Sequence, residues 1–280
     1  MTQGILFLVA TPIGNLEDIT LRALRILKEV DLIACEDTRH TAKLLNRYNI
    51  DTPRESYHKF NERKRSQRLI QLLLEGKKIA LVSDSGTPLI SDPGYELILR
   101  CCREQIRVIP VPGPSAAIAS LQGSGISADS FFFAGFLPPR KASRRRRLEE
   151  LAAIPATTIF FEAPHRILAS LQDMIDVLGP RQASIARELT KVHEEFLYGT
   201  LEELLCLLQT RPRIQGEIAL VIERGQRKRA ALRYPVSIRQ HLEQEINKTG
   251  LSRNEALKSI AGQRGISRKE AYDLLNDELR

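Results

Sequence analysis

Residues 78–94 read KIALVSDSGTPLISDPG, a short apolar run that ends in a loop rich in glycine and proline. Similar apolar runs occur at residues 4–10 (GILFLVA), 31–35 (DLIAC) and 106–111 (IRVIPV). Each run is typical of a strand, and a segment with helical periodicity follows it. This alternation of strands and helices predicts an α/β fold with a parallel sheet covered by helices.

The first part of the chain is expected to form one such domain. Its helices are expected at about residues 18–30, 38–48, 61–75, 94–103 and 115–122. Small turn-forming residues at 122–130 (QGSGISADS) then interrupt the pattern. We therefore expect a first α/β domain over residues 1–122, followed by a linker.

A second alternation of strands and helices predicts a second α/β domain over residues 123–225. Its strands are expected near residues 131–136, 157–161, 184–187, 196–199 and 217–223, and its helices near 143–153, 164–178 and 201–209. No helix is expected between the third and the fourth of these strands. We therefore expect a mixed sheet rather than a parallel one.

The carboxyl-terminal segment is helical in pattern and is expected to form a module over residues 234–280, after a second linker at 224–235. Ala261 lies four residues before Gly265, and Ser267 is suited to cap a following helix. This spacing is typical of a helix-turn-helix, in which glycine allows a positive φ at the turn. Many helical hairpins share the spacing, so contact with nucleic acid and a plain helical cap both stay open.

The formal net charge of +8 is unevenly distributed along the chain. Residues 140–147 (RKASRRRR) contain six basic residues and no acidic one, and residues 224–280 contain 13 basic and seven acidic residues. Such clusters indicate a polyanionic partner, although a solvated face or a helix start also carries charges in this way. We expect residues 140–147 to form a loop at the rim of a ligand cleft.

Composition places the chain among ordinary globular proteins. The chain is 42% apolar and 27% charged, and no apolar run approaches the roughly 18 residues of a membrane span. Its four cysteines, at 35, 101, 102 and 206, show no spacing typical of a metal site or a redox pair. We therefore expect a cytoplasmic protein with free thiols, without a bound metal and without membrane attachment.

Ligands of parallel sheets bind at the carboxyl edge, so the loops that follow the strands form the candidate site. These loops cover residues 10–18, 35–41, 83–94 and 110–117, and none contains the glycine pattern of a dinucleotide-binding or P-loop protein. Three of them combine proline with glycine, which gives rigid backbone groups that approach a ligand closely. This suits a ligand such as adenosine with an amino-acid tail. Tight turns without a ligand are the alternative.

The chain resembles a known superfamily in motifs that follow one another over about 220 residues. The motifs are TPIGNLEDIT, EDTRHT, ALVSDSGTPLISDPG, PVPGPSA, FFEAPHR and ARELTK. They are similar to those of the tetrapyrrole-methylase superfamily of S-adenosylmethionine-dependent methyltransferases. The porphyrin and corrin branches usually have a GxGPGD-type first loop, whereas this chain has TPIGN at residues 11–15. The chain therefore resembles the branch that methylates ribosomal RNA of the small subunit.

The resemblance implies two α/β domains, usually in a homodimer, that bind S-adenosylmethionine in the cleft between them. It also implies methyl transfer to the ribose 2′-hydroxyl of a decoding-site cytidine in 16S rRNA of the small ribosomal subunit. Carried over by motif, the cofactor-binding residues are Pro12, Gly14, Ser83, Asp84, Ser85, Gly86, Thr87, Ser115, Ala116, Glu162, Ala163, Leu189, Gly216 and Glu217. A tetrapyrrole methyltransferase and a non-enzymatic nucleic-acid-binding protein are the alternatives.

A ribose hydroxyl is a weak nucleophile, so a base or a cation beside it assists the transfer. Glu36, Asp37, Arg39 and His40 have suitable chemistry, and their position where a strand becomes a helix aims them at the cleft. We expect Asp37 or His40 to act as the base or as an orienting group, and Arg39 to hold the phosphate next to the target ribose. The alternatives are that Asp37 caps the following helix and that Arg39 forms a surface ion pair.

Further polar residues are expected near the RNA. Phosphate contacts are predicted for Arg140, Lys141, Arg144, Arg145, Arg146, Arg147, Arg264, Arg268 and Lys269. His58 and Lys59 are a second source of groups that reach the acceptor. The roles of four more residues stay open between a structural function and contact with RNA: His165, Arg166, Lys191 and His193.

Overall fold

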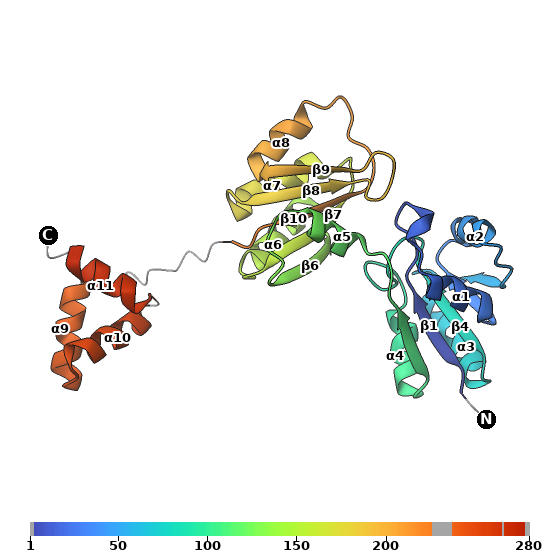
Figure 1. Cartoon of the computed structure of the whole chain (residues 1–280), viewed down its shortest axis with the longest axis horizontal. Coiled ribbons are helices and arrows are strands. Elements are labelled where there is room, and N and C mark those ends of the chain that lie inside the picture. The colour runs from blue at the N-terminus through green and yellow to red at the C-terminus, as the bar shows by residue number, and fades with distance from the viewer. Residues whose placement is uncertain (1–2, 226–236, 265, 278–280) are drawn as a thin grey trace. The chain divides into compact units, whose positions relative to one another are not determined.

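The computed structural model describes residues 3–225, 237–264 and 266–277. The chain forms two compact units, Met1–Arg224 and Gly225–Arg280. The first unit contains two five-stranded sheets, and the second is helical (Figure 1). The predicted α/β fold with a carboxyl-terminal helical module is therefore confirmed. Within the described ranges, no helix is both long and apolar enough to cross a membrane.

The first sheet contains five parallel strands in the order β3-β2-β4-β1-β5. The strands are β1 (Ile5–Val9), β2 (Leu32–Cys35), β3 (Arg54–Ser56), β4 (Lys78–Val82) and β5 (Arg107–Val111). Four of them coincide with the apolar runs of the sequence. The edge strand β3 has no such signal, because all three of its residues are polar.

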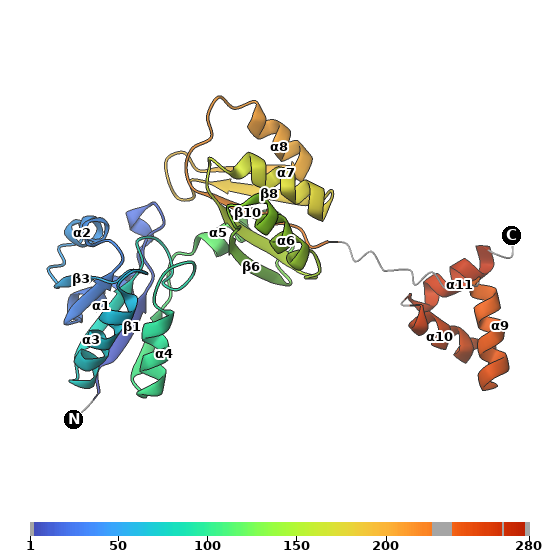
Figure 2. The same cartoon turned by 180° about the vertical axis from the view of Figure 1, so that it is seen from behind.

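Helices cover both faces of the first sheet (Figure 1 and Figure 2). A short 3-10 turn, η1 (Leu16–Asp18), precedes α1 (Leu21–Glu29), and α1 packs with α2 (Thr38–Arg47) on one face. α3 (Glu62–Leu74) and α4 (Tyr95–Arg103) pack on the other face. Successive residues of a strand face opposite sides, so a continuous apolar run such as KIALV supplies both layers of the core.

The second sheet has the strand order β6-β7-β10-β8-β9. Its strands are β6 (Phe131–Phe136), β7 (Thr157–Glu162), β8 (Gln182–Arg187), β9 (Glu195–Thr200) and β10 (Ile218–Ile222). β6 and β7 are parallel, whereas β10 is antiparallel to β7 and β8, and β8 is antiparallel to β9. The predicted mixed sheet is therefore confirmed.

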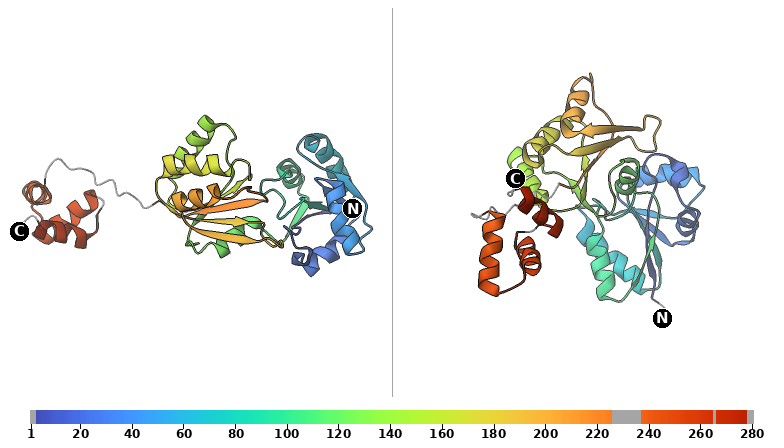
Figure 3. Two further views of the ribbon diagram at one scale, coloured as in Figure 1. Left: turned by 90° about the horizontal axis from the view of Figure 1, so that it is seen from above. Right: turned by 60° about the vertical axis from the view of Figure 1, so that its left-hand side comes forward.

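Four helices pack against the second sheet. α6 (Lys141–Ala152), α7 (Ile167–Leu178) and α8 (Leu201–Gln209) lie on one face (Figure 3). Their leucines share a core with Leu220. α5 (Ala116–Gly123) lies on the other face, with Leu121 in a cluster with Val221. Although α5 falls within the predicted first domain, it packs against β7, β8 and β10. The chain therefore passes from one core to the other between β5 and α5.

The second unit contains α9 (Ile238–Thr249), α10 (Arg253–Gln263) and α11 (Arg268–Asp277), which share a small apolar core. Each helix begins with a serine paired reciprocally to the residue three positions later: Ser237 with Gln240, Ser252 with Glu255, and Ser267 with Glu270. Ser267 therefore caps α11 as predicted. The predicted positive φ of Gly265 and most of the predicted linker 224–235 lie outside the described residues.

Candidate functional site

Three loops of the first sheet are tied together at the carboxyl ends of β1, β4 and β5. Thr11 and Gly86 exchange backbone hydrogen bonds of 2.9 and 3.0 Å. The Thr11 hydroxyl donates to the Ser83 carbonyl, and the Thr87 hydroxyl donates to the Pro114 carbonyl. Gly86 has a φ of +84°, a conformation that favours glycine. The Pro/Gly loops therefore form one connected rim rather than three separate turns.

A cavity of about 390 Å³, here called the large cavity, lies beside this rim. Side chains of β6, β7, β8 and β10 provide an apolar wall: Phe136, Phe161, Ala186, Ile218 and Ala219. Ten of the fourteen predicted cofactor-binding residues also line the large cavity: Ser85, Gly86, Thr87, Ser115, Ala116, Glu162, Ala163, Leu189, Gly216 and Glu217. Both sheets therefore contribute to one hollow.

A second cavity of about 290 Å³, here called the small cavity, adjoins the first, because Ile13, Ser85 and Glu217 line both. The other four predicted cofactor-binding residues line the small cavity: Pro12, Gly14, Ser83 and Asp84. His40 and Lys43 of α2 and Lys191 are the basic residues of its lining. Basic side chains therefore border the small cavity together with the carboxylates of Asp84 and Glu217, whereas none of the basic residues that the structure describes lines the large cavity.

The first loop of the chain meets the segment between β8 and β9 at Gly14. A Cβ atom at Gly14 would lie 2.5 Å from Lys191 Cγ and 2.9 Å from the Leu189 carbonyl oxygen. The next residue, Asn15, donates its backbone N–H to the Thr190 hydroxyl at 2.9 Å. Because only glycine fits this approach, Gly14 allows the two walls of the small cavity to touch.

Lys191 lies between two carboxylates at the boundary of the cavities. Its ammonium is 2.9 Å from Glu188 and 3.1 Å from Glu217. Burial acts to lower the pKa of Lys191, but hydrogen bonds to Glu188 and Glu217 outweigh it and raise the pKa. Lys191 therefore stays charged at neutral pH and fixes Glu217, which lines both cavities.

Three carboxylates, Glu36, Asp84 and Asp92, repel one another at the carboxyl edge of the first sheet. Burial raises the pKa of Asp92 to about 6, and repulsion by Glu36 and Asp84 adds to the shift. Burial also raises the pKa of Glu36. Asp92 lines the large cavity. A cationic group bound beside Asp92, such as the ammonium of an amino-acid tail, would relieve this repulsion.

The sequence matches one protein family, described as tetrapyrrole (corrin/porphyrin) methylases, over residues 6–205. The chain belongs to this methylase family. The resemblance expected from the motifs is therefore confirmed. The predicted cofactor, S-adenosylmethionine, is confirmed at the level of this family of methylases.

Relatives of the methylase cover nearly its whole length. A protein of Halalkalibacterium halodurans named ribosomal RNA small subunit methyltransferase I is 48% identical over 279 residues, which is 99% of this chain and 96% of that protein. Among solved structures, diphthine synthase has a TM-score of 0.62 at 16% identity and covers 79% of this chain and 90% of its own. Uroporphyrin-III C-methyl transferase of Thermus thermophilus, complexed with S-adenyl homocysteine, has a TM-score of 0.54 at 20% identity and covers 78% and 97%. Both structures share the fold of the methylase.

In this methylase Asp37 caps α2, which is the structural alternative to a catalytic role. Its carboxylate accepts the backbone N–H of Arg39 at 2.8 Å and pairs with the Arg39 guanidinium at 3.2 Å. These hydrogen bonds lower the pKa of Asp37, so its carboxylate is a weaker base than a free one. Glu36, Asp37 and Arg39 are not among the residues that line either cavity, whereas His40 lines the small cavity.

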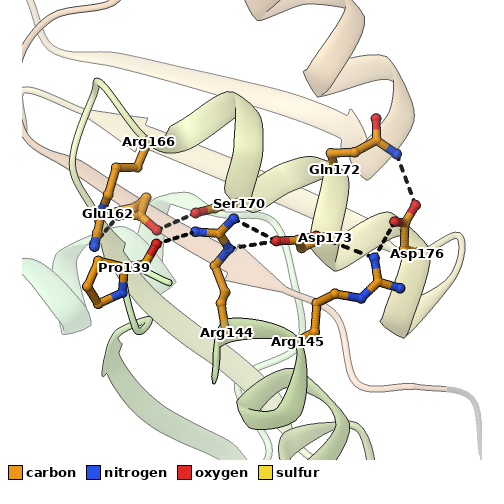
Figure 4. A network of polar contacts seen from close by, with 9 residues as sticks. All are labelled: Pro139, Arg144, Arg145, Glu162, Arg166, Ser170, Gln172, Asp173 and Asp176. Atoms are coloured by element: carbon orange, nitrogen blue, oxygen red, sulfur yellow. Dashed lines mark hydrogen bonds and ion pairs between the residues drawn. The ribbon is translucent and has the colours of Figure 1, made fainter. Parts of the chain in front are cut away.

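Glu162 of the methylase lines the large cavity, but its carboxylate is bound to the start of α7 (Figure 4). Its Oε1 accepts hydrogen bonds from the Ala163 N–H and the Arg166 guanidinium, and its Oε2 accepts the Ser170 hydroxyl at 2.6 Å. Glu162 is only 3% exposed. Both carboxylate oxygens are occupied, so Glu162 holds the wall formed by residues 162–164 in place. The Arg166 guanidinium is bound to Glu162, so Arg166 has a structural role rather than a contact with RNA.

The prediction of a loop at residues 140–147 is wrong, because residues 141–147 form the first turns of α6. Arg144 is 5% exposed, and its guanidinium lies 2.6 Å from Asp173 and donates to the Pro139 carbonyl (Figure 4). Arg145 pairs with the same aspartate at 3.4 Å. Arg144 and Arg145 therefore join α6 to α7, and the burial of Arg144 leaves this arginine no access to a phosphate. Asp173 lies too far along the sequence for this pairing to show in the pattern.

The other cations of this run differ in exposure. Arg140 and Lys141 are exposed, and the Arg146 side chain is 83% exposed. Arg147 pairs with Glu150 at 3.1 Å. Three cations of α6 and its start, Arg140, Lys141 and Arg146, are therefore accessible to a phosphate.

The three predicted RNA-contacting residues of the second unit differ in their surroundings. Arg264 donates to the Ser237 carbonyl and to His241 Nδ1, so it joins α10 to α9. Arg268 and Lys269 are exposed on α11. Residues 237–277 contain seven basic and six acidic residues, so the basic excess of the tail does not come from the helices. It comes mainly from residues 224–236, most of which lie outside the described residues.

Several residues of the large cavity escaped the sequence analysis: Ile13, Ile90, Ser91, Asp92, Phe136, Phe161, Pro164, Ala186, Ile218 and Ala219. Ile13 and Asp92 had a signal, because they lie in loops that contain predicted residues. Phe161 and Ala186 also lie in quoted motifs, FFEAPHR and ARELTK. Phe136, Ile218 and Ala219 lie in none of the quoted motifs, and an apolar side chain that faces a cavity looks like one that faces the core. No three His, Cys, Asp or Glu side chains are grouped to hold a metal ion in the part of the chain that the structure describes.

Proposed function

We propose that the methylase transfers a methyl group from S-adenosylmethionine to ribosomal RNA of the small subunit, at the ribose 2′-hydroxyl of the decoding-site cytidine 1402 in 16S rRNA. The observation that carries the proposal is the pair of adjoining cavities, one with an apolar wall and one bordered by basic side chains. The name of the full-length relative supports rRNA as the substrate. The motifs that resemble the rRNA branch support the target nucleotide.

The large cavity has the size and chemistry of a cofactor site. About 390 Å³ lies within the usual range of ligand pockets. The adenine packs against the apolar wall, which includes Phe161 and Ala219, and the Asp92 carboxylate binds the ammonium of the amino-acid tail. Backbone groups of the connected rim, around Gly86 and Ala116, supply rigid polar contacts at little entropic cost. When bound, S-adenosylmethionine supplies an electrophilic methyl group whose leaving sulfur needs no proton.

The small cavity takes the acceptor ribose. His40 accepts the proton of the 2′-hydroxyl, which raises the nucleophilicity of its oxygen. Lys43 attracts the phosphates beside that ribose. Because Ile13 and Ser85 line both cavities, the two ligands meet at this boundary, and the chain contributes mainly position and exclusion of water.

Contacts outside the cavities complete the proposal. Arg140, Lys141 and Arg146 contact phosphates of the substrate, as do Arg268 and Lys269 of the second unit. We expect the protein to act in the cytoplasm, where its ribosomal substrate is found.

We also infer a homodimer. The resemblance to the tetrapyrrole-methylase superfamily supports this inference, and Phe131 of the edge strand β6 is 45% exposed. Sedimentation velocity should give the mass of two chains. A mass of one chain at every concentration would contradict the dimer.

A map of ribose methylation on 16S rRNA tests the function. Cells that lack the protein are expected to lose one 2′-O-methyl group, and the wild-type gene is expected to restore it. The His40→Ala variant should not restore the mark, while it binds S-adenosylmethionine like the wild type. An unchanged methylation map in the deletion strain would contradict the proposed function.

Calorimetric titration with S-adenosylmethionine separates the remaining classes of function. A binding module without enzymatic activity would give no heat. A tetrapyrrole methyltransferase would bind the cofactor but would leave the 16S map unchanged. The proposed enzyme binds the cofactor and changes the map.

A further inference from the structure

Phe60 is 96% exposed. It lies in the segment Tyr57–Asn61, here called the display loop, between β3 and α3. β3 is parallel to its neighbour β2, so the display loop follows a carboxyl end and lies at the same edge of the sheet as the two cavities. Single exposed apolar side chains are common on proteins, so other features of the loop must decide what this ring does.

The display loop is held by hydrogen bonds on both sides of the ring. The Asn61 side chain accepts the His58 N–H at 2.8 Å and donates to the Ser56 carbonyl at 3.2 Å. Tyr57 is fully buried, and its hydroxyl donates to the Glu62 carboxylate at 3.0 Å. The Phe60 ring is therefore presented to solvent by an ordered loop.

Exposed cations lie on either side of Phe60 in the sequence. Lys59 precedes the ring, and Arg63 and Lys64 lie in the first turn of α3. An aromatic ring among cations is typical of surfaces that bind single-stranded nucleic acid, where bases stack on the ring and cations meet the phosphates. Because a second copy of this chain would bring like charges together, the composition favours RNA as the occupant.

Glu62 links the display loop to the large cavity. Its Oε1 accepts the backbone N–H of Gly94 at 2.9 Å, at the end of the loop 83–94 that lines the cavity. His58 of the display loop also acts electrostatically on Glu36, which neighbours the carboxylate Asp84 of the small cavity. The loop that carries the exposed ring is therefore connected to the walls of the cavities at the same edge of the sheet.

We propose that Phe60 is a stacking platform for an unpaired base of the substrate RNA, next to the methylated nucleotide, and that Lys59, Arg63 and Lys64 contact the adjoining phosphates. The inference rests on the proposed function, because it takes the RNA strand that enters the small cavity as the ligand. A ring stacks on any base, so the platform adds affinity and holds the strand without reading its sequence.

RNA binding by the full chain tests the platform. The probe is a fluorescein-labelled single-stranded RNA of about 12 nucleotides, followed by fluorescence anisotropy. Phe60→Ala is expected to bind roughly 5- to 100-fold more weakly than the wild type, whereas Phe60→Tyr and Phe60→Trp keep the affinity. The control is Leu74→Ala, which removes a 41% exposed side chain at the opposite end of α3 and should leave binding unchanged.

A second set of measurements separates stacking from general apolar contact. Phe60→Leu keeps apolar surface but has no aromatic face, so it should bind like Phe60→Ala. An abasic RNA of the same length should bind equally to the wild type and to Phe60→Ala. Equal affinity of these two proteins for the base-containing RNA overturns the proposal. A loss that persists with the abasic RNA also overturns it.

The salt dependence of binding tests the cations. Lys59→Ala and Arg63→Ala should each reduce the slope of log affinity against log salt by about 0.7. Arg103→Ala, an exposed cation at the far end of α4, should leave the slope unchanged. Unchanged slopes for the first two variants would contradict the phosphate contacts.

Three further outcomes distinguish a dimer interface at Phe60, a failure of the platform alone and a failure of the proposed function alone. If sedimentation shows that Phe60→Ala separates a dimer into single chains, the ring belongs to an interface and the platform is wrong. If the wild type methylates 16S rRNA while Phe60→Ala binds RNA normally, the platform alone fails. If the wild type binds RNA through Phe60 but the 16S map of the deletion strain is unchanged, the proposed function alone fails.

Discussion

The large and small cavities share Ile13, Ser85 and Glu217 but differ in the chemistry of their walls. The large cavity takes its apolar wall from β6, β7, β8 and β10 of the second sheet. The small cavity takes basic side chains from α2 and from the segment between β8 and β9. One edge of the first sheet therefore supports two adjoining cavities, and basic side chains of the described residues line only the small one.

This difference teaches that cofactor binding and acceptor binding depend on separate residues, joined at a narrow boundary. A substitution at the boundary should affect both sites, whereas a substitution deeper in one cavity should affect one site alone. Four variants test this division, from the largest expected effect to the smallest.

Gly14→Ala should damage both cavities. Its Cβ would lie 2.5 to 2.9 Å from Lys191, Thr190 and Leu189, so the two walls must move apart. Misplacement of about 1 Å costs roughly 100-fold in rate, so methyl transfer should fall by at least about 100-fold. Single-turnover transfer and cofactor titration measure the two sites. The control Gly262→Ala, where nothing lies within 4 Å, should leave both unchanged. Normal cofactor affinity in Gly14→Ala would contradict a shared boundary.

His40→Ala should affect the small cavity alone. Loss of a general base lowers kcat by about 100-fold or more, while the cofactor Kd stays unchanged. Single-turnover transfer and cofactor titration measure the two effects. Asp37→Ala is the matched comparison: it removes the cap of α2 and lowers stability but should leave single-turnover transfer intact. A large rate loss in Asp37→Ala, with cofactor binding preserved, would move the base from His40 to Asp37.

Ala116→Leu should affect the large cavity alone. The added carbons enter a wall of the cofactor site, and crowding of this kind is expected to weaken S-adenosylmethionine binding by about tenfold. RNA binding should stay at the wild-type level. Gln122→Leu, at an exposed position of α5 that is not among the lining residues, serves as the control for helix α5. Equal losses in both variants would point to a disturbed helix rather than a filled cavity.

Asp92→Asn should give the smallest effect, with opposite signs for binding and stability. The carboxylate is ionised above a pKa of about 6, so its attraction for the cofactor ammonium is present above pH 6 and is lost as the pH falls through 6. At pH 8 the variant should bind S-adenosylmethionine roughly 2- to 5-fold more weakly. A binding curve measured across pH should be flat for the variant.

Asp92→Asn should raise the stability of the protein, although it weakens cofactor binding. The native state raises the pKa of Asp92 above 3.8, so it binds this proton more tightly than the unfolded state does. The ionised carboxylate therefore destabilises the fold above pH 6. Without the cofactor at pH 8, the variant should melt about 2 °C higher than the wild type, and the gain should vanish near pH 4. A lower melting temperature at pH 8 would contradict this account.

The sheets were largely predictable because their signals are local. Four of the five strands of the first sheet coincide with continuous apolar runs, and the Gly/Pro loops after them line the cavities. Gly14 and Gly86 were picked out as loop residues, and each is required by a close approach or a positive φ. At these positions the local sequence alone indicates the strand or the turn that the structure contains.

The remaining features depend on partners far away in the sequence. The ion pair between Arg144 and Asp173 joins two helices, so the arginine run gave no sign of its buried members. α5 has small apolar residues that suit either sheet, and only the folded chain shows that it packs on the second. Asp37 has the same local sequence whether it caps a helix or faces a cavity. Its role becomes visible only with the cavities.

The reciprocal serine caps of α9, α10 and α11 bear on how the second unit folds. Each pairing spans three residues, and the three helices contact one another within a short stretch of chain. Helical proteins with such local contacts fold in microseconds to milliseconds, whereas sheets built from distant strands need longer. In a refolding experiment the helices of the second unit should therefore form before the two sheets, and at a rate that substitutions in the sheets leave unchanged.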